Sequence, residues 1–169
     1  VGLSPEFSAH LRDYGITALD FDLDNLDIGR LGKLVDMLAK SSAFVTPTIV
    51  VEKAPLKQVD PEFDPSELSK YMPEYVIRNY YVKDTLKTSA DTTRHHWNVR
   101  NYEFILRMLK PMFDGGVKFL AGTDYVVLFT YPGFSLHEEL RILVEEAGVA
   151  PLQALQTATV NPARFFERE

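Results

Sequence analysis

The chain has 169 residues, of which 46% are hydrophobic and 25% charged, enough for one globular domain with a full core. Its net charge of −6 and the absence of cysteine exclude a basic nucleic-acid surface, disulfides and thiolate metal sites. No apolar run approaches the roughly 20 residues that cross a bilayer. We therefore expect no nucleic acid and no membrane as partner. Localisation stays open between the cytoplasm and, if a signal peptide was removed, the periplasm or the exterior.

The N-terminal part of the chain predicts helices and strands in alternation. A short helix is expected over residues 4–13 and a weak strand over Thr17–Phe21. After Asp27, apolar residues at helical spacing predict a helix with one buried face: Leu31, Leu34, Val35 and Leu38. Ala43–Val51 is apolar and β-branched, which favours a buried strand, although Pro47 within it removes a ladder donor.

The middle of the chain predicts a strand–helix–strand crossover with an enlarged loop. Prolines interrupt residues 52–90 repeatedly, and we interpret this segment as loop and short helix that covers an active site. A long helix is predicted from about Thr92 to Phe113, and Gly115-Gly116 end it. A strand is predicted over Val117–Ala121. Strands joined in this way pair in parallel, with a right-handed connection.

The C-terminal part carries clear helix signals. Ser135 and Glu138 stand at the spacing of a capping box, which predicts the start of a helix. The other boundary signals are Gly148 after that helix, Pro151 at the start of the next, and Pro162 behind an Asn161 cap. The whole pattern predicts an α/β fold with too few strands to close a barrel.

Asp124 is the principal candidate for chemistry. It follows the apolar run Phe119–Ala121 and the turn Gly122-Thr123, so it is expected at the C-terminal end of a strand. Parallel α/β barrels place catalytic groups at such positions. A carboxylate there can bind a metal ion or transfer a proton. The alternative is that Asp124 only caps the turn into the following loop.

The histidines are weaker candidates. His95 and His96 are adjacent in the predicted long helix, so their side chains point about 100° apart and fit a solvated or interface face. His10 is isolated and expected on the surface. His137 follows the Pro132-Gly133 loop. For His137, contact with a substrate or support of a ligand is weighed against a structural role that buttresses this loop.

Aromatic residues on the loop side of Asp124 predict the wall of a pocket: Tyr125, Phe129, Tyr131 and Phe134. Among them Tyr125 and Tyr131 are the candidates for substrate binding. Tyrosines of the cover segment can extend the same wall: Tyr71, Tyr75, Tyr80 and Tyr81. The alternative is that these rings only fill the mouth of a barrel.

Three segments, in this order and spacing, resemble the end of the barrel in metal-dependent amidohydrolases, in particular the imidazolonepropionase-like branch: Phe119–Asp124, Pro132–Leu140 and Pro151–Ala163. Thr46-Pro47-Thr48-Ile49 is similar to the strand-seven segment of this family. The resemblance implies the C-terminal portion of a TIM-like (β/α)8 barrel, incomplete as given. Residues 1–169 would form one partial barrel domain with about strands seven and eight and their helices, residues 52–90 being the cover.

The resemblance also implies a function, hydrolysis of carbon–nitrogen bonds in a small amide-type substrate, either cyclic or peptide-like. The expected cofactor is a divalent metal, with zinc as the first choice, in one or two ions. Asp124 would be a metal ligand and the shuttle that carries a proton from metal-bound water to the leaving nitrogen. His137 matches the Ser-Leu-His-Glu pattern of the family.

Other ligands of the family have no match in this sequence: the His-x-His of the first strand, the bridging lysine or glutamate, and the two middle-strand histidines. One aspartate cannot hold a catalytic zinc, which takes about three protein ligands and a water. We therefore expect the chain to be a fragment that is inactive alone and is completed by the remainder of the barrel or by a partner chain. The alternative is a non-catalytic barrel remnant that binds a small molecule or a protein.

Overall fold

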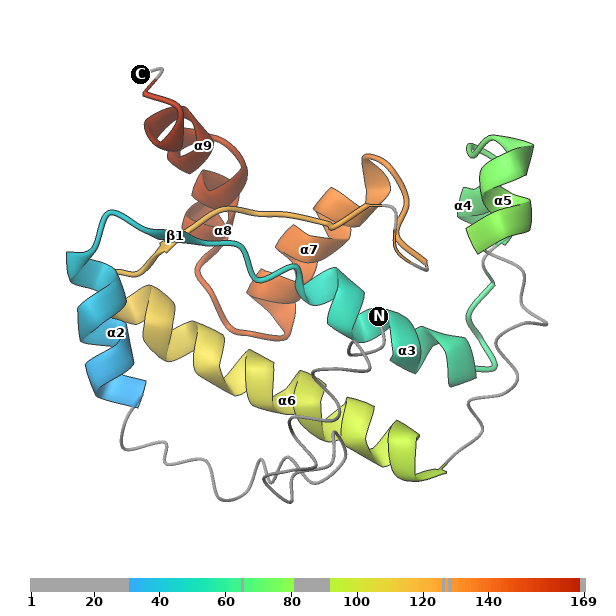
Figure 1. The fold of residues 1–169 in the computed structure, drawn as a ribbon, viewed down its shortest axis with the longest axis horizontal. Coiled ribbons are helices and arrows are strands. Elements are labelled where there is room, and N and C mark those ends of the chain that lie inside the picture. Colours follow the sequence, from blue (N-terminus) through green and yellow to red (C-terminus); the bar gives the residue numbers. More distant parts are fainter. Residues whose placement is uncertain (1–30, 65, 81–91, 126, 128, 168–169) are drawn as a thin grey trace, which may run out of the picture.

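The computed structural model describes residues 31–64, 66–80, 92–125, 127 and 129–167 (Figure 1). Its elements in chain order are α2 (Leu31–Lys40), β1 (Phe44–Val45), α3 (Ile49–Val59), α4 (Ser66–Ser69), α5 (Glu74–Tyr80), α6 (Thr92–Asp114), β2 (Lys118–Phe119), α7 (Phe134–Glu145), α8 (Pro151–Ala158) and α9 (Val160–Phe165). The helix expected over 4–13, the strand expected over 17–21 and His10 lie outside the described residues.

The two strands form a small parallel sheet. Phe44 pairs with Lys118 and Val45 with Phe119. The Leu120 amide continues the ladder by donating to the Val45 carbonyl at 2.9 Å. The parallel pairing that the strand–helix–strand pattern predicts is therefore confirmed. In the described part of the chain the fold is α/β and rich in helix, with one small parallel sheet. The barrel of which the resemblance implies the C-terminal portion is not itself shown by these residues.

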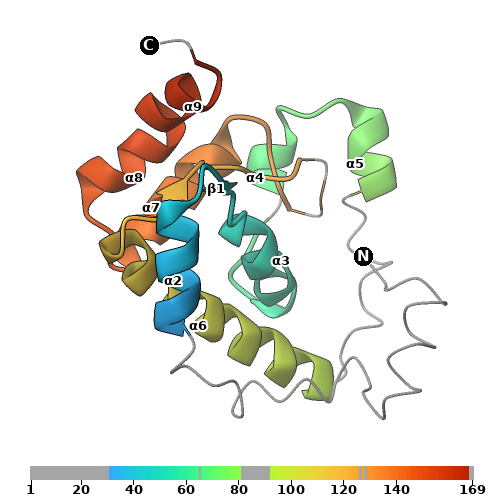
Figure 2. The ribbon, with the colours of Figure 1, turned by 60° about the vertical axis from the view of Figure 1, so that its left-hand side comes forward.

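Helix α3 lies between α6 and α7 and packs against both (Figures 1 and 2). Helix α2 packs against α6, and α8 joins α7 to α9. The main core fills the space between these helices and the sheet, and its most buried members include Ile49, Val50, Phe119, Ile142 and Leu143. No helix in the described ranges is long and apolar enough to cross a membrane.

The predicted strand Ala43–Val51 is wrong beyond Val45. Ile49 and Val50 begin helix α3 instead, and both are fully buried at 0% exposure. Two local features end the strand, since Pro47 has no amide hydrogen for a ladder and Thr48 adopts a left-handed conformation with φ 47°. Burial between α6 and α7 then outweighs the β propensity of the branched residues.

Helix α6 runs from Thr92 to Asp114 and confirms the predicted long helix. Its end forms as the glycines indicate, because the Val117 amide donates to the Met112 carbonyl and Gly116 has φ 83°. Gly115 is needed for space, since a Cβ there would lie 2.1 Å from Cγ1 of Val35. Val35 is the buried residue of α2, which confirms the helix predicted from apolar spacing. Leu34 is 42% exposed, so its place on the predicted buried face is wrong.

The predicted capping box of α7 is wrong. The helix begins at Phe134 with Gly133 as its N-cap. Ser135 lies inside the first turn, where its Oγ accepts from the Tyr131 amide at 2.7 Å. Glu138 pairs with Lys57 of α3 at 2.5 Å instead of closing the box. Lys57 on a neighbouring helix has thus replaced the Ser135 amide as the partner of Glu138.

The remaining helix boundaries are confirmed in part. Gly148, with φ 70°, lies in the turn that ends α7, and Pro151 is the first residue of α8 as predicted. The Asn161 cap is wrong, since α9 already begins at Val160. Asn161 Nδ2 instead donates to the Phe119 carbonyl at 2.9 Å and holds β2 in place.

The segment 52–90 contains more helix than predicted. Its first residues belong to α3, and the short helices α4 and α5 follow. A second apolar cluster joins this segment to the loop before α7: Ala54, Met72, Val76, Phe129 and Tyr131. Residues 81–91 lie outside the described part.

Candidate functional site

Two loops leave the sheet at the same edge, because β1 and β2 are parallel. A Cβ added to Gly122 would lie 2.4 Å from Cγ2 of Thr46 and 3.3 Å from Cγ2 of Thr48. Only a glycine lets the two loops approach this closely. We call the residues Thr46–Thr48 and Gly122–Asp124 the carboxyl edge.

Both loops of the carboxyl edge contain a residue in the left-handed conformation. Thr48 has φ 47° and ψ 46°, and Asp124 has φ 46°. For residues other than glycine this conformation costs of order 1–3 kcal/mol, the more so for a β-branched threonine. Such strain concentrates at functional sites. Phe129 and Glu167 also have positive φ, so two of the four such residues in the described part lie at the edge where Asp124 was predicted to act.

Asp124 follows β2 at the carboxyl edge, and its side chain is exposed. Among the residues that the structure describes, no group of three or more His, Cys, Asp or Glu side chains could hold a metal ion. One carboxylate supplies one of the about three protein ligands that a catalytic zinc takes. The described residues by themselves therefore do not fit a catalytic metal, and Asp124 can contribute a single ligand.

The other predicted site residues lie in different environments. Tyr125 is 41% exposed beside Asp124, and His137 is exposed in the first turn of α7. Tyr131 is 2% exposed, and its side chain belongs to the second apolar cluster. Tyr125 and His137 are accessible to a ligand, whereas the burial of Tyr131 places its ring within the packing behind the loop.

The cover segment packs against the loop that follows Asp124. The ring of Phe63 meets that of Phe129 edge-on, with centroids 5.1 Å apart. Tyr71 lies against Phe134 at 5.3 Å, and both rings are partly exposed. Tyr75 is 67% exposed. The predicted gathering of aromatic rings is therefore present in part, and the role of the segment as an active-site cover stays a prediction.

The histidines of α6 do not converge. His96 is exposed and His95 is half-buried. This agrees with their adjacent positions on a helix, which direct the two side chains apart. They add no ligand to the carboxyl edge.

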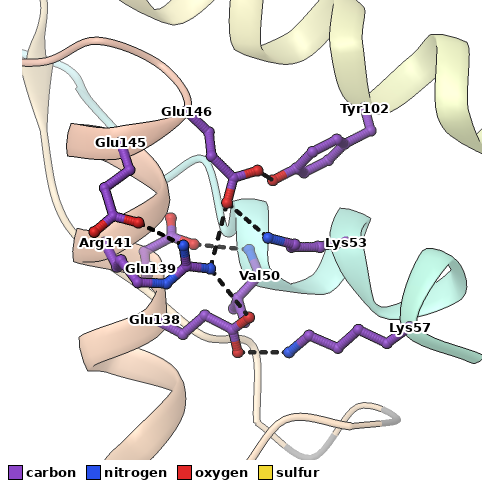
Figure 3. Close-up of polar contacts among 9 residues, drawn as sticks. All are labelled: Val50, Lys53, Lys57, Tyr102, Glu138, Glu139, Arg141, Glu145 and Glu146. Carbon is purple, nitrogen blue, oxygen red and sulfur yellow. Dashed lines mark hydrogen bonds and ion pairs between the residues drawn. The ribbon is translucent and has the colours of Figure 1, made fainter. Parts of the chain in front are cut away.

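A polar network between α3, α6 and α7 was not predicted (Figure 3). Lys53 of α3 donates to Glu146 at 2.6 Å, and the Tyr102 hydroxyl of α6 donates to the same carboxylate at 2.7 Å. Arg141 of α7 lies 3.3 Å from Glu146 and 2.7 Å from Glu145. The network fixes α7 to both neighbouring helices.

Protonation in this network follows from burial and charge. Burial acts to raise the pKa of Glu146, but hydrogen bonds from Lys53 and Tyr102 prevail and hold it below its ordinary value. Burial and the hydrogen bond to Glu146 raise the pKa of Tyr102, so its hydroxyl keeps its proton. The pair of Glu146 and Tyr102 is therefore a charge-assisted hydrogen bond at neutral pH.

Glu139 is the buried charged residue in the described part of the chain, at 0% exposure. Its Oε2 accepts from the Val50 amide in the first turn of α3 at 2.8 Å (Figure 3). Burial raises the pKa of Glu139 to about 7, although the amides of Val50 and Ile49 lower it. A carboxyl group from α7 thus caps the start of α3, and the pKa of this group lies close to neutral pH.

A signal for Glu139 was present in the sequence. The buried residues of α7 are Ser135, Glu139, Ile142 and Leu143. Glu139 stands in phase with Ile142 and Leu143 at helical spacing, so a helical projection places its carboxyl group on the apolar face. A carboxylate at such a position needs a donor from elsewhere in the fold, which the sequence does not identify.

Replacing Glu139 with Gln is expected to remove a pH dependence of stability. Between about pH 4.5 and pH 7 the folded state keeps the proton that the unfolded state has lost, so rising pH favours unfolding of the wild type. A shift from 4.5 to about 7 corresponds to about 3 kcal/mol. Urea titrations across this pH range should show that the free energy of unfolding of the wild type falls by this amount relative to that of Glu139→Gln.

The control for this titration is Glu103→Gln, which changes an exposed carboxylate of α6. Its free energy of unfolding should follow that of the wild type at every pH. Equal slopes for Glu139→Gln and the wild type would show that Glu139 does not bind its proton more tightly in the folded state.

Comparison with known families gives a match to the model of the Amidohydrolase family over residues 78–169. The matched span is more than half of the chain and includes β2, Asp124 and helices α6 to α9. No curated protein and no solved structure matches the chain. The similarity of Thr46–Ile49 to a strand of that family lies outside the matched span.

Proposed function

The chain belongs to the amidohydrolase family of hydrolases, and on this premise we propose that it forms part of a metal-dependent enzyme that cleaves carbon–nitrogen bonds. The observation that carries this proposal is the position of Asp124. It lies in the matched span, follows a strand of a parallel sheet, is exposed and has a left-handed backbone conformation. These features fit a carboxylate presented at the catalytic end of an α/β architecture.

We assign two roles to Asp124 in the proposed enzyme. It offers one ligand to a divalent cation, with zinc the expected ion and one or two ions per site. It also accepts a proton and returns it to the leaving nitrogen, the work of a general acid–base group. The remaining ligands come from the remainder of a TIM-like barrel or from a partner chain, because no group of three or more possible ligands occurs among the described residues.

The substrate we propose is a small amide, either cyclic or peptide-like, as in the imidazolonepropionase-like branch. Tyr125 is next to Asp124 and partly exposed, so its ring can contact a bound substrate. His137 is exposed and can offer a directed hydrogen bond. Tyr131, the third proposed substrate residue, is buried behind the loop and would shape the pocket through the position of its neighbours.

The test is metal-dependent turnover by the natural protein that contains this sequence. We expect hydrolysis of at least one substrate in a panel of cyclic amides, linear amides and dipeptides. Turnover should disappear after chelation and return on addition of zinc, because the proposed site needs the cation for the reaction. A protein that binds no metal and hydrolyses no member of the panel would favour the alternative, a binding module without catalysis.

A further inference from the structure

Glu139 is buried on the face of α7 that contributes to the apolar main core. Its helical neighbours Ile142 and Leu143 are members of the main core. The cations that α3 and α7 bring to this region, Lys53, Lys57 and Arg141, pair with other carboxylates. Among the described residues no cation pairs with Glu139, and a buried carboxyl group of this kind is costly. Its contact with the Val50 amide therefore calls for an explanation.

The contact holds the start of α3. The first amides of a helix have no partner within the helix, and Thr48 at the N-cap makes no side-chain cap hydrogen bond. Glu139 Oε2 replaces that cap from 89 positions along the chain. We call Thr46–Thr48 the β1 loop. It directly precedes the first turn of α3, so the hydrogen bond to Glu139 holds the backbone next to Thr48.

The β1 loop in turn contacts the loop that carries Asp124. Thr46 and Thr48 leave no room for a Cβ at Gly122. From the other side, the Ala121 amide donates to the Thr157 carbonyl of α8 at 3.0 Å. The backbone before Asp124 is therefore confined between the β1 loop and α8. A shift of the β1 loop would remove the contact on one side of this backbone.

We propose that Glu139 is a positioning residue, which fixes the carboxyl edge by anchoring the first turn of α3. Its carboxyl oxygen acts as a hydrogen-bond acceptor, so a glutamine can replace it and an apolar residue cannot. The effect on turnover rests on the proposed function of Asp124. The effect on the backbone of the carboxyl edge does not.

The first experiment measures backbone order by NMR relaxation in the natural protein and in two variants, Glu139→Gln and Glu139→Leu. In the wild type the amides of Gly122–Asp124 are expected near the order parameter of rigid backbone, about 0.85. Glu139→Leu should lower it to about 0.6 or less there and at Thr46 and Thr48, with α6 unchanged. Glu139→Gln should keep the wild-type values.

The matched control is Leu143→Ala, which removes a buried side chain from the same face of α7 but leaves the carboxyl group. It should lower stability without lowering order at Gly122–Asp124. If Glu139→Leu does not fold, Glu139→Asp takes its place, because its carboxyl group falls one methylene short of the Val50 amide. The proposal would be overturned if the order parameters of Gly122–Asp124 stayed at wild-type values in the variant that lacks the contact with Val50. It would also be overturned if Leu143→Ala lowered these order parameters by the same amount.

The second readout is turnover. Glu139→Leu should lower kcat by roughly 10- to 100-fold with little change in KM, since a small misplacement of a reacting group has effects of this size. Glu139→Gln should stay within about twofold of the wild type. If the loop becomes mobile while kcat does not change, the anchoring by Glu139 stands and the catalytic role of Asp124 fails. The two proposals are thereby tested separately.

Discussion

Replacing Asp124 with Asn is expected to lower the rate of the proposed amide hydrolysis by roughly 10²- to 10⁴-fold, the range for loss of a general acid–base group. Asparagine has nearly the same size and tolerates the left-handed backbone conformation that Asp124 adopts. It cannot accept the proton, and its neutral amide is a weaker ligand. Because the side chain is exposed, the free energy of unfolding should change by no more than about 0.5 kcal/mol.

The measurement is kcat and bound metal for the purified variant, together with its unfolding curve. Asp36→Asn serves as the control, since Asp36 is an exposed carboxylate on α2, and its kcat should equal that of the wild type. An Asp124→Asn protein that is fully active and loaded with metal would end the assignment of Asp124.

Replacing Phe119 with Ala is expected to destabilise the fold by about 3–5 kcal/mol, the usual cost of removing a buried aromatic ring. Phe119 lies in β2 at 1% exposure, and its ring stacks on that of Phe113 with centroids 4.0 Å apart. The loss would leave a cavity between the sheet and α6. Urea unfolding at constant pH measures the change.

Leu152→Ala on α8 is the matched control for Phe119→Ala, because Leu152 is 67% exposed. It should change the free energy of unfolding by about 0.5 kcal/mol or less. A cost below about 1 kcal/mol for Phe119→Ala would show that the ring is not packed in the core as the structure has it.

Sequence patterns predicted the elements that depend on local chemistry. Apolar spacing identified α2, and the glycines after Asp114 identified the end of α6. Pro151 marked the first residue of α8. Each of these signals acts through residues within a turn or two of the boundary, so no knowledge of the tertiary structure was needed.

Elements that depend on distant partners were missed. Ile49 and Val50 have strand propensity, but α6, α7 and the carboxyl group of Glu139 stabilise them as the start of a helix. Ser135 and Glu138 have the spacing of a capping box, yet Tyr131 and Lys57 bind them. For Ile49 and Val50 a contact with a segment far along the chain decided the outcome. For the capping box, α7 begins two residues before the predicted start, and Lys57 of a neighbouring helix binds Glu138.

The sequence predicted where along the chain the candidate site lies, but it did not predict the geometry of that site. The sequence placed Asp124 after a strand, and the parallel pairing of β1 and β2 puts Thr46 and Thr48 beside Gly122, two residues before Asp124. The left-handed backbone of Thr48 could not be predicted, because threonine avoids this conformation. The roles of Asp124, Tyr125, Tyr131 and His137 stay predictions for experiment.

The role that we propose for Asp124 is that of a metal ligand at the carboxyl edge. The most direct measurement is a crystal structure of the natural protein with zinc, in which anomalous scattering locates the ion. We predict a zinc ion within coordination distance of the Asp124 carboxylate, with further ligands from residues that the structure does not describe. An ion bound elsewhere, with Asp124 free in solvent, would contradict the claim.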